Sequence, residues 1–422
     1  MPPGILFGWE SRGPGPFGFG SSDRPGPSPV FYADEAPITV IASTGSGKGR
    51  DCLVPLLLAS EAPAIVVDIK GELSAVCGRR RREMGHRVVN IDPFGIAGGQ
   101  DRLNPFDLFG LEGAQIDCDA EMIAAQLGDG HEYGSDAFWS DTACGLVSGL
   151  IAHAASGVEK RSFAVVRTLL TCDDVDYQLA VLVDKHGDRM HPFAHAELSS
   201  YLQISSDKTR PSVLSTARTF LKSLNSASVA ACLEDSTYDL KDIVDGAPLD
   251  VFITIPPEKV ISHAGLLRLL VGTLITAILR RREIPERQTT FLIDEAAQLG
   301  KGFGPLLTAS TLMRGFGLQL VSVWQDVAQI KGRYPDDWRT ILNNSGAILT
   351  FGIGHHGAAK DAAEFLGMEA AELLMMKPDE AALSVRGQGV RKISRLNYLE
   401  DEQFRGLYDP NPYHGRSRGK GI

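Results

Sequence analysis

The sequence has no apolar run long enough to span a membrane. A spanning helix needs about 18 or more consecutive, mostly apolar residues. The longest candidate, "LLRLLVGTLITAIL" at 266–279, is shorter than that and contains Arg268. The N-terminus also lacks the charged and then apolar pattern of a signal peptide. These absences predict a soluble, cytoplasmic chain.

Cysteine is scarce, and its spacing excludes the common metal motifs. No C-x-x-C pair occurs, which is typical of reduced, buried thiols in a cytosolic protein. The six cysteines are Cys52, Cys77, Cys118, Cys144, Cys172 and Cys232.

Positive charge is also in the minority. The formal net charge of −10 argues against a general nucleic-acid coat, which is normally basic overall. Local basic stretches could still contact a polyanion. The 43% hydrophobic and 22% charged residues are those of an ordinary globular protein, and 422 residues leave room for about two or three domains.

Short β-branched runs alternate with helical stretches over most of the chain. This alternation predicts an α/β fold with a mostly parallel central sheet covered by helices. Strands are expected at 38–42, 64–68, 87–92, 250–256, 290–295, 318–324 and 347–351. Residues 264–283 are apolar nearly all round, so we expect a core helix there.

The middle of the chain has a different pattern. Residues 112–224 have little strand character, and their apolar residues recur at three- and four-residue spacing. We therefore expect an all-helical insertion there, within a nucleotide-binding domain formed by 31–111 and 225–410. The Gly- and Pro-rich residues 1–30 are expected to be an extended lead-in, and the basic residues 411–422 a flexible tail.

A phosphate-binding loop is predicted where the first of these strands meets a helix. The stretch "ASTGSGKG" follows the P-loop pattern G-x-x-x-x-G-K-[ST] except at its two ends. Gly45 and Gly47 let backbone N–H groups turn toward phosphate oxygens, and Lys48 reaches the β and γ phosphates. The residues expected to bind the nucleotide are Thr44, Gly45, Ser46, Gly47, Lys48, Gly49 and Arg50.

Two residues depart from the motif. Ala42 replaces the first glycine, which mainly eases the turn, so this is a mild change. Gly49 replaces the last Ser or Thr and removes the usual hydroxyl ligand of Mg²⁺. Another group or a water must then fill that place.

An acidic pair completes the predicted site. The strand in "TTFLIDEAAQL" runs into Asp294, expected in the Mg²⁺ shell, and Glu295, expected to polarise the attacking water as general base. The next strand ends in "VWQD", which places Gln325 beside the γ-phosphate as a sensor. A polar residue that simply caps a strand is the alternative for Gln325.

A competing motif, "GIGHHG" at 352–357, fits the dinucleotide-binding pattern G-x-G-x-x-G. That fingerprint normally follows the first strand of its fold, with an acid about twenty residues further on. Here it follows a late strand, and the next acids lie in a helix or turn. We therefore expect His355 and His356 to cap the following helix and to bind no metal.

Taken together, these stretches resemble the coupling ATPases of type IV secretion and conjugation, which deliver DNA or proteins to a secretion channel. The matching stretches, spread over 38–367, are "TGSGKG", "IVVDIKGELSAVCGRRRREMGHRVVNIDPFG", "RLNPFDL", "DAFWSDTA", "DVFITIPPEKV", "FLIDEAAQLG" and "RGFGLQLVSVWQDVAQI". Because members with "GSGKG" are familiar, the resemblance makes Gly49 a family feature. It leaves open how Mg²⁺ is held, and Asp68 is the candidate for a water-mediated contact.

The resemblance implies a RecA-like motor that hydrolyses ATP with Mg²⁺ as a homo-hexameric ring, with ATP sites between subunits. The expected catalytic residues are Lys48, Glu295, Gln325 and, from a neighbouring subunit, Arg314 in "LMRGFGL". A solvated or salt-bridged arginine is the alternative for Arg314. The helical domain of such proteins faces the cytoplasm and recognises cargo or the relaxase.

Family members usually begin with membrane-spanning helices, and this sequence shows none before or within "GILFGWE". The chain is either a soluble branch that relies on a membrane partner or a fragment, and the sequence leaves both open. We expect it at the cytoplasmic face of the inner membrane, reached through a partner among the type IV secretion components.

Transient DNA contact is a further expectation. Loops after the strands, such as 331–338 with Lys331 and Arg333, could line a central pore and touch phosphates. The runs "RRRR" at 79–82 and "RRR" at 280–282 fall at predicted helix ends, where cations complement the helix dipole, so they are weaker candidates.

The leading interpretation is an ATP-hydrolysing coupling protein that recruits a relaxase–DNA complex or effector proteins and delivers them to a type IV channel. One alternative is a RecA-like translocase that moves double-stranded DNA outside secretion, but "IPPEKV" and "DIKGEL" favour the coupling family. The other is an adaptor that uses nucleotide only to assemble, which would have no need of a positioned base such as Glu295.

Overall fold

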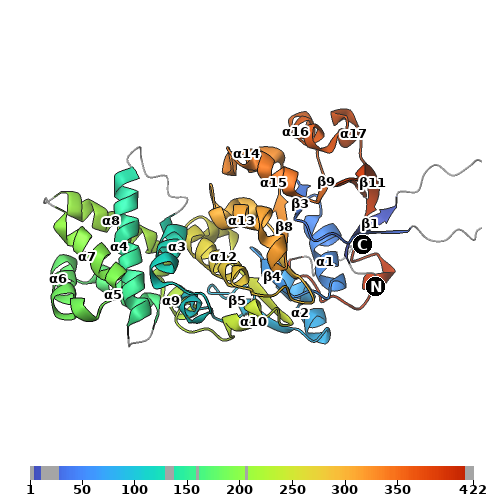
Figure 1. The fold of residues 1–422 in the computed structure, drawn as a ribbon. Coiled ribbons are helices and arrows are strands. Elements are labelled where there is room, and N and C mark those ends of the chain that lie inside the picture. The colour runs from blue at the N-terminus through green and yellow to red at the C-terminus, as the bar shows by residue number, and fades with distance from the viewer. Residues whose placement is uncertain (1–3, 11–27, 129–136, 158–160, 205–207, 414–422) are drawn as a thin grey trace, which may run out of the picture.

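The computed structural model describes residues 4–10, 28–128, 137–157, 161–204 and 208–413. They contain an eleven-stranded sheet with the order β2-β1-β11-β10-β9-β3-β8-β7-β4-β6-β5 (Figure 1). The strands are β1 (Ile5–Glu10), β2 (Pro29–Tyr32), β3 (Ile38–Ala42), β4 (Ala64–Val67), β5 (Arg87–Ile91), β6 (Leu249–Ile253), β7 (Thr289–Ile293), β8 (Leu318–Trp324), β9 (Ala347–Phe351), β10 (Glu380–Val385) and β11 (Gly389–Arg395).

Helices cover this sheet and extend beyond it. They are α1 (Val54–Ala59), α2 (Glu72–Glu83), α3 (Ile116–Gly128), α4 (Ala137–Ser156), α5 (Phe163–Thr171), α6 (Val175–His186), α7 (Pro192–Gln203), α8 (Thr209–Phe220), α9 (Ala227–Cys232), α10 (Leu240–Val244), α11 (Pro257–Val260), α12 (Ala264–Leu279), α13 (Gly304–Thr311), α14 (Val327–Arg333), α15 (Trp338–Asn344), α16 (His356–Leu366) and α17 (Ala370–Leu374).

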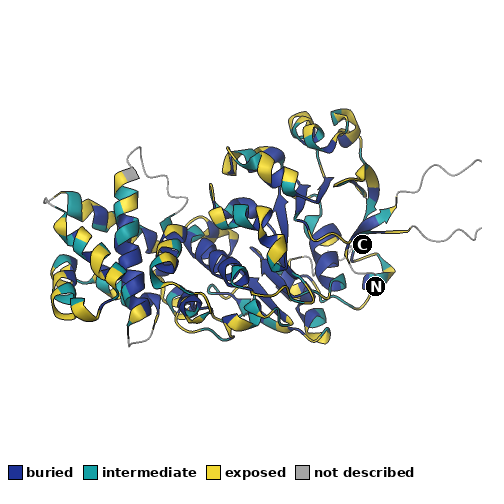
Figure 2. Ribbon diagram, viewed as in Figure 1, coloured by how far each residue is buried: buried dark blue, intermediate teal, exposed yellow. Residues whose placement is uncertain are grey.

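The strands from β9 to β5 in the sheet order are parallel. Every residue of β3, β4, β6, β7, β8 and β9 is buried, because helices cover both faces of a parallel sheet (Figure 2). The core helix α12 is buried throughout from Gly265 to Ile278. All the strands expected from the sequence are present, which confirms the α/β class with a mostly parallel sheet.

The other side of the sheet is antiparallel and was not predicted. Strands β10 and β11 form a hairpin that joins β9 to β1. Strand β1 falls inside the predicted lead-in, and Ile5, Leu6 and Phe7 are all buried. Ile5–Glu10 is therefore extended, as expected for 1–30, but it belongs to the sheet, because this short apolar run packs there despite its Gly- and Pro-rich surroundings. Residues 11–27 of the lead-in and 414–422 of the tail lie outside the described residues.

Between β5 and β6, the described residues form helices and no strand. Helix α4 packs against α3, α5, α7 and α8, and α3 in turn packs against the core helix α12. The group from α4 to α8 lies at the far left of Figure 1, away from the sheet. This arrangement agrees with a helical insertion, whose boundaries at 112 and 224 stay a prediction.

None of the helices in the described ranges is both long and apolar enough to cross a membrane. Cys52, Cys77 and Cys232 are buried, whereas Cys118 is exposed. The prediction of buried thiols is therefore confirmed only in part.

Candidate nucleotide site

The P-loop, the acidic pair and Gln325 follow three neighbouring strands of the sheet, β3, β7 and β8. Strand β3 pairs in parallel with β8 and β9, and β8 pairs in parallel with β7. The carboxyl ends of parallel strands lie at one edge of the sheet, which is where ligands bind in open α/β folds. The loop after β3, the acidic pair after β7 and Gln325 after β8 therefore meet at this carboxyl edge.

The loop after β3 has the backbone conformation of a phosphate-binding turn. Gly45 and Gly47 have φ values of +77° and +94°, a region that favours glycine. The N–H of Ser46 donates to the carbonyl of Ser43 at 3.1 Å and closes the turn. A helical segment then begins at Gly49 with a π-helical turn and continues into α1. Backbone donors of the loop and of this helix start therefore lie beside one another.

The glycine-rich stretch after β9 supports this loop. Gly352 has φ +70°, and a Cβ there would lie 2.2 Å from Cβ of Ser46. The hydroxyl of Ser43 donates to the carbonyl of Gly352. His355 is the N-cap residue of α16 and His356 is its first residue, as expected, although the side chain of His355 makes no capping hydrogen bond. The first glycine of "GIGHHG" thus allows close approach to the P-loop.

Lys48 lies between the P-loop and the acidic pair. Its Nζ is 3.1 Å from Oδ1 of Asp294 and 3.2 Å from Oε2 of Glu295, and it donates to the carbonyl of Asp294 at 2.9 Å. Burial lowers the pKa of Lys48, but the two carboxylates outweigh that effect and raise it. Lys48 is therefore a charged ammonium placed where phosphate oxygens of a nucleotide on the loop would lie.

Glu295 is held by two amides as well as by Lys48. Nε2 of Gln325 donates to its Oε2 at 3.2 Å, and Nε2 of Gln329 donates to its Oε1 at 3.0 Å. Gln329 also accepts from the backbone N–H of Gln325 at 2.9 Å. Gln329 was not predicted from the sequence. It lies in the first turn of α14, the helix that follows Gln325.

A buried ion pair between Asp51 and Arg395 supports the P-loop. Asp51, which is 3% exposed, pairs with Arg395 on β11 at 3.0 Å and also accepts from Arg50. Nη1 of Arg395 donates to the carbonyl of Ser46 at 2.7 Å. Arg395 therefore ties the hairpin to the loop. Sequence reasoning missed it because no motif marks that strand.

Asp68 is close to the site but already engaged. It is 0% exposed, and its two carboxylate oxygens accept backbone N–H groups of Glu72 at 3.1 Å and Ser74 at 2.9 Å. Burial raises its pKa to about 7, with a smaller contribution from the nearby carboxylate of Asp294. These bonds make Asp68 the residue that caps α2, and its expected contact to Mg²⁺ stays a prediction.

Of three further predicted residues, Arg314 lies at the amino edge, and the other two lie in the helix that follows Gln325 at the carboxyl edge. Arg314 precedes β8, at the amino edge of the strands, and pairs with Asp34 at 3.3 Å. Lys331 and Arg333 lie in helix α14, so the expectation of a loop there is wrong at these two residues. Lys331 pairs with Asp361 at 2.8 Å.

The arginine runs are largely structural. Arg81 and Asp250 are both fully buried and pair at 2.6 Å. Arg281 is also buried and donates to the carbonyls of Val244, Phe316, Gly317 and Ile243. Each run therefore contributes at least one arginine to the interior, and neither is a continuous basic surface.

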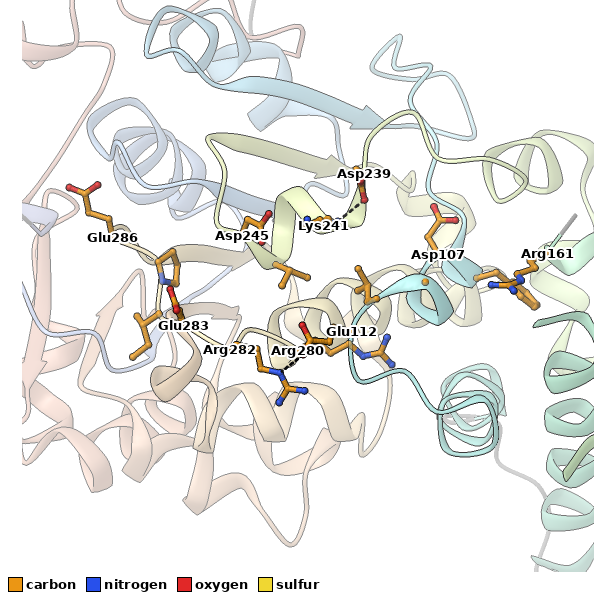
Figure 3. Close-up of a pocket in the computed structure, with 16 residues that line it drawn as sticks. Asp107, Glu112, Arg161, Asp239, Lys241, Asp245, Arg280, Arg282, Glu283 and Glu286 are labelled. Carbon is orange, nitrogen blue, oxygen red and sulfur yellow. Dashed lines mark hydrogen bonds and ion pairs between the residues drawn. The ribbon is translucent and has the colours of Figure 1, made fainter. Parts of the chain in front are cut away.

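A separate cavity of about 930 Å³ lies near the amino edge, beside α10 and the end of α12 (Figure 3). Charged side chains dominate its lining, and Arg282 lies 3.6 Å from Glu112 across it. It contains none of the residues predicted to bind nucleotide.

The carboxyl edge fits a nucleotide with Mg²⁺. Oδ1 of Asp294 has the ammonium of Lys48 as its partner at 3.1 Å, and the Asp294 side chain is 13% exposed, so a metal ion could replace that partner. No group of three or more His, Cys, Asp or Glu side chains in the described ranges could hold a metal ion by itself. That agrees with Mg²⁺, which usually takes one or two carboxylates and completes its shell with phosphates and water.

A family model described as type IV secretory system conjugative DNA transfer matches residues 14–402. The conjugal transfer protein TraG of Escherichia coli is 25% identical over 321 residues, which cover 70% of this chain and 49% of TraG. Protein VirD4 of Rhizobium radiobacter is 24% identical over 347 residues, which cover 79% of this chain and 47% of VirD4. The chain thus spans about half the length of the curated relatives it matches.

Solved structures show the same fold. The plasmid coupling protein TrwB, in complex with the non-hydrolysable ATP analogue ADPNP, matches with a TM-score of 0.68 and 17% identity over 86% of this chain and 85% of that one. VirB4 of Thermoanaerobacter pseudethanolicus matches with a TM-score of 0.55 and 14% identity over 94% of this chain and 97% of that one. These likenesses confirm the RecA-like P-loop fold class.

Proposed function

Because the chain belongs to the type IV secretory system conjugative DNA transfer family, we propose that it is a nucleotide-driven coupling protein. It binds ATP with Mg²⁺ at the carboxyl edge, hydrolyses the ATP, and passes a relaxase–DNA complex or effector proteins to a type IV secretion channel. The bridge from Lys48 to Asp294 and Glu295 carries this proposal, because it joins the P-loop to the metal-binding and base positions of one site.

Each side chain has a role that its contacts support. Backbone N–H groups of the loop and Lys48 bind the phosphates, and Asp294 faces Mg²⁺. Glu295 orients and deprotonates water while Gln325 and Gln329 fix its two oxygens. TrwB has been solved with ADPNP and with ADP and Mg²⁺, and this supports the choice of nucleotide and metal.

Assembly and partners form the second part of the proposal. The chain acts as a homo-hexamer at the cytoplasmic face of the inner membrane, where type IV secretion components hold it. Arg314 lies at the amino edge, far from its own P-loop, so it can serve only the site of a neighbouring subunit. Contact with DNA is transient, because a net charge of −10 gives little sequence-independent affinity.

ATP turnover by the purified chain tests the proposal. It is measured with and without single- and double-stranded DNA, at concentrations that force assembly. We expect DNA to raise the turnover and Lys48→Ala to abolish it. Lys241→Ala, an exposed lysine at the amino edge, serves as the control and should leave turnover unchanged. Nucleotide binding without turnover under all conditions would favour the assembly adaptor instead.

A further inference from the structure

The P-loop of this chain lacks the hydroxyl that normally faces Mg²⁺, and the structure shows what occupies its neighbourhood. Gly49 stands at the position of the missing Ser or Thr and begins the helical segment. A Cβ built on Gly49 would meet one atom within 4 Å outside its own helix, Oε1 of Glu72, at 3.6 Å. A carboxylate oxygen therefore lies beside the place where the hydroxyl would be.

The backbone of Glu72 is fixed in this place. Glu72 is the first residue of α2, and Asp68 caps that helix through the N–H groups of Glu72 and Ser74. The turn before it needs Gly71, which has φ +68° and whose Cβ would lie 2.9 Å from Cβ of Ala97. The buried Asp68 thus acts on Glu72 as a positioning residue.

The side chain of Glu72 is oriented by the C-terminal segment. Nδ2 of Asn411, a residue 7% exposed, donates to Oε1 of Glu72. Asn411 is itself held by the backbone N–H of Tyr413 at 2.9 Å, and the hydroxyl of Tyr413 donates to the carbonyl of Lys70 at 2.8 Å. A donor that orients a carboxylate in this way is typical of the residues behind metal ligands.

Glu72 and Asp294 both lie close to the buried Asp68. The N–H of Glu72 donates to Oδ1 of Asp68, and the N–H of Asp294 donates to the carbonyl of the preceding residue, Val67. The charges of both carboxylates act on Asp68, together with its burial, and raise its pKa. Asp294 pairs through Oδ1 with Lys48 of the P-loop, and Glu72 lies beside Gly49, the next residue of that loop. Two carboxylates and phosphate oxygens form a donor set that Mg²⁺ prefers.

We propose that Glu72 supplies the protein oxygen that faces Mg²⁺ in place of the P-loop hydroxyl. This inference rests on the proposed nucleotide site, and it transfers the role expected of Asp68 to Glu72.

Manganese-dependent binding of ADPNP tests the proposal without turnover. Bound Mn²⁺ is followed by electron paramagnetic resonance, with Mg²⁺ as competitor, and ADPNP affinity is also measured in EDTA. Glu72→Gln should raise the Mn²⁺ concentration for half-saturation at least tenfold, as expected for lost metal contacts (about 10–100-fold). ADPNP affinity in EDTA should be unchanged or tighter, because a negative charge near the phosphates is removed.

A second variant distinguishes the loss of a metal contact from damage to the fold. Gly49→Ser has room for its Cβ, and in the Glu72→Gln background it should restore most of the lost Mn²⁺ affinity. Glu83→Gln, at the other end of α2, is the matched control and should change nothing.

Three results would overturn the inference. An unchanged Mn²⁺ dependence in Glu72→Gln leaves the proposed function intact but removes Glu72 from the metal shell. An equal loss of ADPNP affinity with Mn²⁺ and in EDTA assigns Glu72 a structural role in the pocket. A wild-type chain that binds no ADPNP in either condition overturns the proposed function itself and this inference with it.

Discussion

Two pairs of opposite charge lie at opposite edges of the same parallel strands. At the amino edge, Arg81 and Asp250 are 0% exposed, and Arg81 also donates to the carbonyls of Leu57, Ser60 and Ala62. At the carboxyl edge, Lys48 pairs with Oδ1 of Asp294 at 3.1 Å, and the two side chains are 18% and 13% exposed. The first pair is closed to solvent, whereas a ligand can reach the second.

The two pairs differ as structural and functional charges do. A buried ion pair whose polar atoms are all satisfied has no capacity left for a ligand. A pair that stays partly exposed, placed beside a glycine-rich turn and a helix start, retains that capacity. The residue types alone do not distinguish the two, because both combine a cation with an aspartate.

The largest effect is expected at Glu295. Glu295→Gln should lower kcat about 10²–10⁴-fold, because the amide cannot accept a proton from water. ATP binding should be retained, since Gln has nearly the same shape. Steady-state turnover and nucleotide titration measure the two quantities, with Glu283→Gln, an exposed glutamate after α12, as control. A kcat within a factor of a few of wild type would remove Glu295 as the base.

Changes to the ion pair at the amino edge should lower the stability of the fold. Asp250→Asn leaves Arg81 buried without its charge partner and should lower the free energy of unfolding by about 3–5 kcal/mol. Denaturant unfolding measures this change. Asp294→Asn is the matched variant at the carboxyl edge. It should lower the free energy of unfolding far less, because Lys48 retains its ion pair with Glu295. Equal losses for the two variants would contradict the comparison.

The pKa of Asp250 leads us to expect that the free energy of unfolding depends on pH. Burial raises its pKa, but hydrogen bonds from Arg81 and His86 outweigh burial, so the pKa is lowered in the folded state. The stability it contributes is therefore present above its ordinary pKa and is lost as pH falls through the lowered value. When unfolding is measured at decreasing pH, the free energy of unfolding should fall less steeply in Asp250→Asn than in wild type.

Arg395 should have an intermediate effect. Arg395→Ala removes the bond to the carbonyl of Ser46 and one partner of the buried Asp51. A charged hydrogen bond contributes about 1.5–3 kcal/mol, so nucleotide affinity should fall about ten- to hundredfold. Titration with a fluorescent nucleotide measures it, and Arg391→Ala, exposed on the same strand, is the control. An affinity equal to that of the control would show that the hairpin does not organise the loop.

The smallest effect is expected at Lys331. Its pair with Asp361 is partly exposed and it lies 4.7 Å from the ring centre of Trp338. Lys331→Ala should lower the free energy of unfolding by no more than about 1 kcal/mol, as exposed pairs do. Thermal and denaturant unfolding measure this, and a loss as large as that of Asp250→Asn would be inconsistent with an exposed pair.

The sequence predicted the parallel part of the fold well because its strands are short, buried, β-branched runs. It failed at β11, where "GVRKISR" buries only Ile393 completely and gives no clear alternation. Arg395 could not be found from sequence for the same reason, since 349 positions separate it from Ser46. Motifs led to Lys48, Asp294, Glu295 and Gln325, whereas the position of Glu72 beside Gly49 depends on tertiary packing.

The arginine runs show the limit of charge patterns. "RRRR" at 79–82 reads as a solvated helix end, yet Arg81 is fully buried because a single turn of a helix presents its side chains to different surroundings. Burial of one residue in such a run depends on a partner such as Asp250, which is 169 positions away.

A structure of the chain with ADPNP and Mg²⁺ tests the central claim most directly. We predict the phosphates on the N–H groups of the loop after β3, with Nζ of Lys48 moved from Asp294 and Glu295 onto a phosphate oxygen. Arg81 should remain on Asp250. Phosphates bound elsewhere, or a Lys48 that stays on the two carboxylates while nucleotide is present, would contradict the assignment of the carboxyl edge as the nucleotide site.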